Sequence, residues 1–416
     1  ISSPARKVNP ASGIRQMIQF ASRTARMYNN GMDQNRLISN YRLLHRIPEP
    51  GFSEFKTQDF IIEHLSKING IALHKAAGTG LLVYKPGKCG CRTIAFRADM
   101  DGLPLTEATG LEYASTHPGF MHACGHDGHM AILMELILST RDSEFDNNLL
   151  FIFQPAEEGP GGAASIIKDD SFARFKPDAV YGLHVFPDLP SGCAASRKGP
   201  FFAGVREFIL RFQGVEAHAA TGSKRNSLLA AVNTVHSSLA KVNASIREPF
   251  LFHFGRFSSG VRVNIIAPEA LVEGTMRVFC KKTRDRITRI LTAEAMREAA
   301  SRNLEMELQF RCEYPVLRNS GPETALAGSA CRGAGLSFRE HDPLYLGEDF
   351  AYYLEHIPGA FLLLGVHDND CAGKLHTRDF CFNPSLLSSG VKLLREIALL
   401  EDARTGRMPD YQCKEP

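Results

Sequence analysis

The chain has 416 residues, which is too long for one small domain and favours two or three. Its composition, with 44% hydrophobic and 22% charged residues, is ordinary for a globular protein. The net charge of +3 gives no reason to expect nucleic acid or an anionic membrane as a partner. No apolar run reaches the roughly 18 residues that span a bilayer, so we expect no membrane contact.

The N-terminal segment is basic, because residues 1–32 contain five Lys or Arg residues and no acid. We predict an N-terminal extension at residues 1–33 and a tail at residues 404–416, both outside the core fold. The scattered cysteines, with Cys89 and Cys91 expected as free thiols, favour a reducing compartment. We therefore expect a cytoplasmic protein, with organelle targeting by residues 1–31 as the alternative.

Strands alternate with helices in the first half of the chain, which is typical of an α/β layer with a largely parallel sheet. Apolar periodicity predicts helices at residues 35–44, 57–68 and 130–140 and strands at residues 80–84, 92–96, 149–153 and 179–183.

The pattern changes near Gly199 to the order βαββαβ, which is that of a ferredoxin-like unit. The predicted strands are residues 208–212, 250–257, 270–279 and 304–310, and the predicted helices are residues 227–242 and 283–302. Helix–strand alternation then resumes, with helices at residues 324–333 and 350–354 and a strand at residues 360–364. We therefore predict one domain from residues 34–198 and 312–403, with a second domain inserted at residues 199–311.

Residues 121–130 contain an unusual density of metal-binding side chains: His122, Cys124, His126, Asp127 and His129. Thiolate, imidazole and carboxylate groups are ligands of a divalent metal such as zinc. A lone His or Cys is more often a buried packing residue. The cluster leaves both interpretations open until further ligands are found.

Further ligand types follow the predicted strands, where functional residues of open α/β sheets gather. They are Arg97, Asp99, Asp101, Gln154, Glu157, Glu158, His184, His367 and His376. In the adjacent pair Glu157–Glu158, one carboxylate can bind a cation while the other accepts a proton from water, although a solvated acidic loop is the alternative. Asp99 and Asp101 either cap the next turn or orient a ligand histidine.

With these motifs in order, the chain resembles the M20 metallopeptidases. More narrowly, it resembles the amidohydrolase branch of that family, which contains aminoacylases, hippurate hydrolases, N-acetyldiaminopimelate deacetylases and auxin-conjugate hydrolases. The segments that carry the resemblance are residues 45–49, 97–104, 121–130, 154–159, 182–184, 217–220, 264–268, 273–277, 347–350 and 375–377.

The resemblance implies an α/β fold in which a largely parallel-sheet catalytic domain of the zinc-exopeptidase type carries an inserted ferredoxin-like α+β lid domain. The lid is implied to form a homodimer. The implied metal ligands are Cys124, His126, Glu158, His184 and His376. They imply two divalent ions per subunit, for which zinc, manganese, nickel and cobalt all remain open.

The resemblance also implies roles for five further residues. Glu157 is the general base on metal-bound water, and Asp101 lies behind a metal ligand. His218, on the lid, polarises the scissile carbonyl in a neighbouring active site. Asn264 and Arg277 hold the substrate carboxylate, for which a guanidinium is well suited.

We therefore predict a metal-dependent amidohydrolase that cleaves the amide bond of N-acyl amino acids. One alternative is a dipeptidase or small-peptide carboxypeptidase of the same superfamily, which would make a dipeptide the partner. A second alternative, from another class, is a non-catalytic metal-binding or ligand-binding protein on the same fold. A closed structural zinc site is disfavoured, because the candidate ligands are scattered along the chain.

Overall fold

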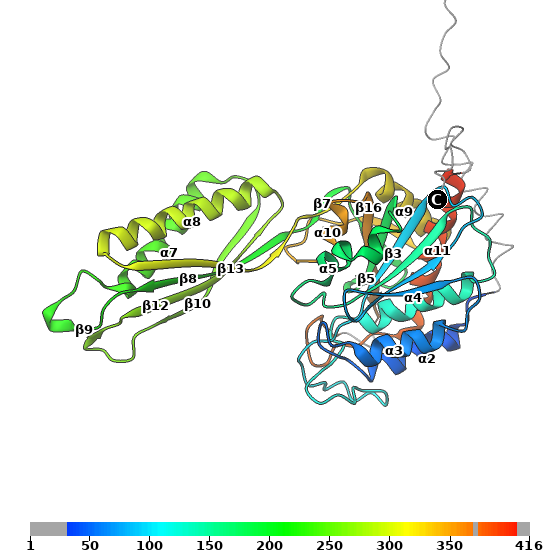
Figure 1. Ribbon diagram of the computed structural model, residues 1–416, viewed down its shortest axis with the longest axis horizontal. Helices are drawn as coiled ribbons and strands as arrows, with labels where there is room; N and C mark the ends of the chain where they lie inside the picture. Colours follow the sequence, from blue (N-terminus) through cyan, green and yellow to red (C-terminus); the bar gives the residue numbers. More distant parts are fainter. Residues whose placement is uncertain (1–30, 369–372, 406–416) are drawn as a thin grey trace, which may run out of the picture. The chain divides into compact units, whose positions relative to one another are not determined.

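The computed structural model describes residues 31–368 and 373–405 (Figure 1). Contacts divide the chain into two compact units. The first comprises the chain through Gly199, residues Asn319–Asp342 and the chain from Tyr352, and the second comprises Pro200–Arg318 and Pro343–Ala351. The domain boundaries predicted from the sequence describe parts that fold independently, which contacts do not test. These boundaries therefore stay predictions.

A mixed eight-stranded sheet forms the centre of the first unit, in the order β1-β2-β4-β3-β5-β16-β6-β15. Strands β4, β3, β5 and β16 run parallel, whereas β2 and β6 pair antiparallel with β4 and β16. The strands are β1 (Ala72–Ala76), β2 (Gly80–Lys85), β3 (Thr93–Asp99), β4 (Asn148–Gln154), β5 (Ala179–Pro190), β6 (Cys193–Ser196), β15 (Ser337–Glu340) and β16 (Gly359–His367). The predicted α/β class with a largely parallel sheet is confirmed.

Helices cover this sheet, and β3 and β4 are therefore buried along their whole length. The helices of this part of the chain are α2 (Gln34–His45), α3 (Phe55–Leu65), α4 (His126–Thr140), α5 (Gly162–Lys168), α6 (Asp170–Ala173), α9 (Gly321–Gly333), α10 (Ala351–Leu354) and α11 (Leu387–Thr405). Helix α4 lies between α2, α11 and the sheet, which explains why it is apolar almost all round.

The start of α4 depends on a glycine. Gly125, at the N-cap, has a left-handed φ of 86°, and a β-carbon there would lie 2.4 Å from Cγ2 of Val185 on β5. Glycine tolerates this conformation and lets the helix approach the sheet closely. The first turn of α4 is consequently pressed against the middle of β5.

The second unit has a four-stranded antiparallel sheet in the order β10-β12-β8-β13. The strands of this sheet and the two long helices, in chain order, are β8 (Gly204–Gln213), α7 (Ser227–Ser245), β10 (Phe250–Ser259), β12 (Glu269–Val278), α8 (Lys281–Arg302) and β13 (Glu305–Tyr314). Apolar residues such as Phe208, Met276 and Leu291 form the core between this sheet and α7 and α8. The predicted ferredoxin-like unit is confirmed.

One expectation about cysteines is wrong. Cys89 and Cys91, which we expected as free thiols, are paired in a disulfide. The turn at Gly90, with a positive φ of 65°, brings their Cα atoms to 5.2 Å.

The predicted targeting segment and most of the predicted tail lie outside the described residues. Among the residues that are described, no helix has the length and apolar character needed to cross a membrane.

Candidate active site

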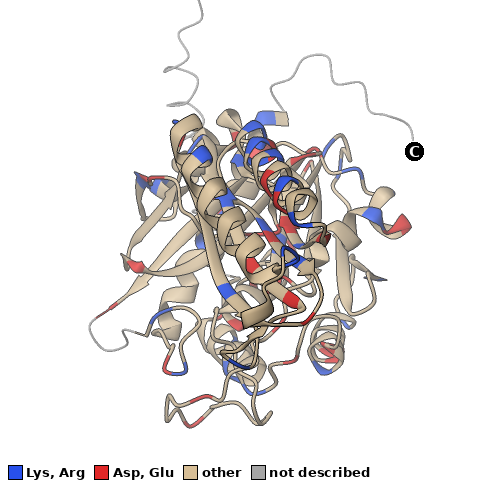
Figure 2. Ribbon diagram, turned by 90° about the vertical axis from the view of Figure 1, so that its left-hand side faces the viewer, with Lys and Arg blue, Asp and Glu red and all other residues tan. Residues whose placement is uncertain are grey.

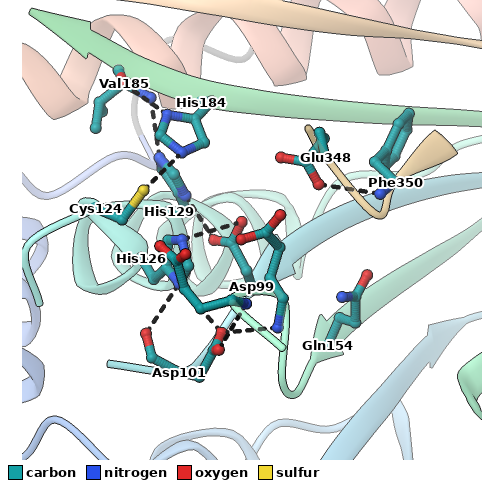
Figure 3. A network of polar contacts seen from close by, with 12 residues as sticks. Asp99, Asp101, Cys124, His126, His129, Gln154, His184, Val185, Glu348 and Phe350 are labelled. Atoms are coloured by element: carbon teal, nitrogen blue, oxygen red, sulfur yellow. Dashed lines mark hydrogen bonds and ion pairs between the residues drawn. The ribbon is translucent and has the colours of Figure 1, made fainter. Parts of the chain in front are cut away.

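The candidate metal ligands of the first unit converge beyond the ends of β3 and β4 and beside the middle of β5, and Figure 3 shows three of them, Cys124, His126 and His184. Cys124 lies just before α4 and His126 is its first residue, whereas Glu158 follows β4. His184 lies within β5, and His376 comes from the loop after β16. Segments separated by as many as 252 residues thus contribute to one site.

The potential metal-binding atoms of these five residues lie close to one another. The Cys124 sulfur is 3.3 Å from Nε2 of His184 and 3.3 Å from Nε2 of His376. The same His376 nitrogen lies 3.0 Å from Oε1 of Glu158. Donor atoms of Cys124, His126 and His184 lie within 4.8 Å of one another, as do those of Cys124, Glu158 and His376. Cys124 therefore belongs to two candidate ligand groups and stands between them.

Glu157 lies beside these groups. Its carboxylate, His126 and Glu158 form a further group within 4.8 Å, and the residue is only 7% exposed. The backbone N–H groups of Glu157 and Glu158 donate to the two carboxylate oxygens of Asp101, at 3.0 and 2.9 Å. Asp101 thereby fixes the backbone from which both glutamates project.

Asp101 also holds a candidate ligand. Nδ1 of His126 lies 2.9 Å from the Asp101 carbonyl oxygen, so the ring donates its Nδ1 proton and turns Nε2 toward the site. This contact supports the expectation that Asp101 orients a histidine, although it is the carbonyl oxygen that accepts at this distance. Such outer contacts fix the tautomer and direction of metal-binding histidines.

His129 and His122, from the same sequence cluster, have different surroundings. Nδ1 of His129 bonds Asp99 at 2.6 Å, and its Nε2 accepts the backbone N–H of Val185 at 2.9 Å. Both nitrogens of His129 are occupied, and the ring fixes the strand next to His184. His122 is buried, and neither ring nitrogen has a hydrogen-bond partner among the described residues.

The electrostatics of the site favour a bound cation. Burial raises the pKa of the Cys124 thiol well above its usual value, and Glu158 and Glu157 raise it further. Burial lowers the pKa of His126, but Asp99, Asp101 and Glu158 outweigh it and raise the pKa to about 10. Positive charge placed among these groups would stabilise the thiolate and replace the proton on His126.

Buried polar atoms of two candidate ligands also favour a bound cation. Nε2 of His126 is buried without a hydrogen-bond partner among the described residues, and Oε1 of Glu158 has the ion pair with Nε2 of His376 but no hydrogen bond. Each such atom costs roughly 1–3 kcal/mol unless something else satisfies it. The donor set of one thiolate, three imidazoles and a carboxylate suits a borderline divalent metal. The residues present therefore fit the metal that the sequence implies.

Residues 95–400 match the family described as peptidase family M20/M25/M40. The chain belongs to this family. It is 38% identical over 348 residues to an N-acetyldiaminopimelate deacetylase of Exiguobacterium sibiricum, covering 82% of this chain and 92% of that protein. A second protein of that name, from Shouchella clausii, is 38% identical over 376 residues, with 89% and 98% covered. The resemblance to the amidohydrolase branch and the prediction of a metal-dependent amidohydrolase are thereby confirmed.

A solved structure of the same family agrees with the fold. It is a dinuclear metal-binding M20 peptidase from Bacillus subtilis, 30% identical, with a TM-score of 0.76 and coverage of 88% of this chain and 98% of that one. The present chain, as a member of the same family, is therefore an enzyme that depends on divalent metal.

The remaining predicted site residues lie in the second unit. His218 on β9 (Ala217–His218) pairs with Ile265 on β11 (Ile265–Ile266), and the carbonyl oxygen of Asn264 accepts the N–H of Ala219. The structure thus brings His218 and Asn264 together. Nδ1 of His218 accepts the N–H of Ala220 at 3.1 Å, so a neutral ring carries its proton on Nε2.

Arg277 is not part of this pair. It lies near the end of β12, eight residues after Glu269, the first residue of that strand. At about 3.3 Å per residue, the two residues are roughly 26 Å apart. Its Nη1 donates to the Tyr345 carbonyl oxygen at 2.8 Å. Within one lid, Arg277 and the pair His218–Asn264 therefore lie too far apart to hold the same small substrate.

Sequence reasoning did not identify Glu54 as part of the site. Its side chain is fully buried, and Oε1 accepts the N–H of Ala156 at 2.8 Å while Oε2 accepts the Thr79 hydroxyl at 2.5 Å. Glu54 and Asp101 together bind three consecutive N–H groups, those of residues 156–158. The only local signal was an acid just before the helix α3, which reads as an ordinary helix start.

Proposed function

We propose that the protein hydrolyses the amide bond of N-acyl amino acids and releases a carboxylic acid and a free amino acid. The observation that carries the proposal is the convergence of five candidate ligands from distant segments beside Glu157. The names of the relatives favour an acetyl group on the substrate and a diamino dicarboxylic acid such as diaminopimelate as its amino acid.

Cys124, His126, Glu158, His184 and His376 would hold the metal. When bound, divalent ions supply Lewis acidity and make water a nucleophile near neutral pH. The proposal of two ions is supported by the two candidate ligand groups that meet at Cys124 and by the dinuclear relative. Zinc, manganese, nickel and cobalt are all compatible with this donor set.

Glu157 would act as the general base and acid. Its buried carboxylate accepts a proton from the attacking water and returns it to the leaving amine. Asp101 positions the Glu157 backbone and the ring of His126, so it acts through other residues. Asp99 positions His129 in the same way.

The lid residues would bind and polarise the substrate. His218 carries a proton on Nε2 that can be donated to the developing oxyanion, and Arg277 can grip a carboxylate. Asn264 would add an amide contact from the same corner as His218.

Because His218 and Arg277 are far apart in one lid, we infer a homodimer in which His218 and Asn264 serve the partner's active site. A largely apolar surface near this corner supports the inference. It consists of the exposed residues Leu228, Leu229, Val232, Val261 and Val263. Helix α7, which carries three of them, has a single charged residue, whereas its neighbour α8 is densely charged (Figure 2). Exposed apolar surface of this kind marks interaction sites.

The proposal is tested with metal-depleted protein that is re-supplied with zinc, manganese, nickel or cobalt in turn. Each form is assayed with N-acetyl amino acids and with dipeptides of the same residues. We expect hydrolysis of the N-acetyl compounds only in the presence of metal. Faster cleavage of the dipeptides would support the dipeptidase alternative, and metal binding without turnover of either class would support a binding protein.

A further inference from the structure

A long loop of the first unit, residues 103–121, contains neither a helix nor a strand and leads directly to the candidate ligands. Leu103 and Met121 exchange backbone hydrogen bonds at 2.9 and 3.0 Å, so the two ends of the loop are held together just before Cys124. Loops of this length without secondary structure are uncommon in compact domains and usually have a function. The 103–121 loop therefore needs an explanation beyond connecting β3 to α4.

One side of the 103–121 loop is anchored to α4 through Glu107, whose side chain is 5% exposed. Oε1 of Glu107 lies 3.2 Å from Nε2 of His45, and Nδ1 of His45 lies 2.6 Å from Asp127 in the first turn of α4. The other carboxylate oxygen of Glu107 accepts the N–H of Ser115 at 2.6 Å. Glu107 thus joins two parts of the loop to the helix that begins at a candidate ligand.

The other side of the 103–121 loop is bonded to residues 373–383, which we call the His376 loop. Nε of Arg378 donates to the carbonyl oxygen of Thr106 at 2.8 Å, and the N–H of Ala108 donates to the carbonyl oxygen of Arg378 at 2.7 Å. These two contacts lie on either side of Glu107 in the sequence. The 103–121 loop consequently connects the start of α4 to the His376 loop.

His376 is the histidine ligand with the least support for its ring. Nδ1 of His126 and Nδ1 of His184 each donate to a carbonyl oxygen, at 2.9 and 2.7 Å, and such contacts fix the direction of a ligand ring. Among the described residues, Nδ1 of His376 has no such acceptor, and the side chain is 52% exposed. The position of the His376 ring therefore depends on its backbone.

The backbone of His376 has a conformation that its surroundings must maintain. Its φ of 62° is left-handed, and this conformation costs a residue other than glycine free energy. The N–H of His376 donates to the carbonyl oxygen of Ala123 at 2.8 Å, and Arg378 supplies the two contacts to the 103–121 loop. The bonds on both sides of His376 thus hold the conformation that directs its ring.

We propose that Arg378 is a positioning residue for the candidate ligand group Cys124–Glu158–His376. Through Arg378, the 103–121 loop holds the His376 loop in the conformation that points the His376 ring at the other two ligands. The group Cys124–His126–His184 has no member in the His376 loop, so it does not depend on Arg378. The inference rests on the proposed function, because it concerns one of the two proposed ions.

Retention of metal against a chelator measures this dependence. Zinc-loaded protein is equilibrated with increasing concentrations of a chelator, and the zinc that remains per subunit is determined by mass spectrometry. Arg378→Gln should release one of two zinc equivalents at a roughly tenfold lower chelator concentration than wild type and should hold the other as wild type does. Arg378→Lys keeps a cationic donor and should restore most of the retention. The control is Arg339→Gln, an exposed change on β15 that should alter neither equivalent.

A second substitution tests whether Arg378 acts through the 103–121 loop. Glu107→Gln weakens the anchor to His45, so it should lower retention of the same zinc equivalent. Because both side chains act through one loop, the effect of the double variant should be smaller than the product of the two single effects. Glu112→Gln, an exposed change on the same loop, is the control. Effects that multiply would show that Arg378 does not act through this loop.

The assay of hydrolysis distinguishes failure of this inference from failure of the proposed function. At limiting zinc, Arg378→Gln should cleave N-acetyl amino acids more slowly than wild type, and saturating zinc should restore its kcat. If both equivalents leave together or neither leaves earlier, while the protein cleaves these substrates, the proposed function stands and the role of Arg378 is wrong. If wild-type protein holds two ions and cleaves no N-acyl compound, the proposed function fails, whereas selective release from Arg378→Gln still supports its role. Arg378 is exposed, so its substitution removes no core contact.

Discussion

The two groups of predicted site residues differ in how firmly the chain holds them. In the first unit, Asp99, Asp101 and His126 are buried, and neighbouring groups fix their direction. In the second unit, His218 and Asn264 are exposed, and they accept hydrogen bonds from the backbone N–H groups of Ala220 and Ala219, respectively. The buried group forms its geometry within one chain and needs a cation to balance its charge. Under the proposed function, the exposed group takes part in catalysis only when the active site of a partner subunit is brought to it.

The largest effect is expected from a substitution at Glu157, which tests whether turnover can be lost from the buried group while metal binding is kept. Glu157→Gln keeps the size of the side chain but removes the proton acceptor, so kcat should fall by roughly 10²- to 10⁴-fold. Metal content, measured by mass spectrometry, should stay at the wild-type level. Glu63→Gln, an exposed change on α3, is the control. Turnover at the wild-type rate would show that another group is the base.

A substitution at His218 tests whether the exposed group acts in the active site of a second subunit. His218→Ala should retain metal and lose roughly a hundredfold in kcat/KM, because a donor to the oxyanion is missing. Mixed dimers with Glu157→Gln provide the decisive measurement. If His218 serves the partner's site, random pairing restores about a quarter of wild-type activity. If each lid serves its own subunit, the mixture stays inactive.

The difference between the two groups also explains what the sequence could predict. Glu157 directly follows a predicted strand, and Cys124 and His126 lie in a short motif just before a predicted helix, so patterns along the chain identify all three. The contact between Glu54 and Ala156 spans 102 residues and depends on packing that no local pattern encodes. Composition similarly could not predict the turn that pairs Cys89 with Cys91.

Glu54 tests how far the buried group relies on support behind it. Glu54→Ala removes the acceptor of the Ala156 N–H, which should loosen the loop that carries Glu157 and lower kcat roughly tenfold. Glu54→Gln retains an acceptor oxygen and should stay within about threefold of wild type. Metal content and KM should change little in either variant. Equal kcat values for Glu54→Ala and wild type would remove Glu54 from the positioning network.

The smallest effect is expected on stability rather than catalysis, at the buried His45. Its Nδ1 lies 2.6 Å from Asp127 and its Nε2 lies 3.2 Å from Glu107. Burial lowers the pKa of His45, but the hydrogen bonds to Asp127 and Glu107 outweigh it and raise the pKa to about 9. The imidazolium thereby ties the loop that contains Glu107 to the first turn of α4.

A raised pKa in the folded state stabilises the protein below the unfolded value of about 6.5, and this contribution is lost as the pH rises through about 9. The free energy of unfolding, measured by urea titration with metal present, should therefore decline by roughly 2–3 kcal/mol from pH 6.5 to pH 9. His45→Gln cannot take up the proton, so its stability should be lower at pH 6.5 and should change less over the same range. Parallel curves for the two proteins would mean that another group titrates, and that the charge on His45 does not hold this loop to α4.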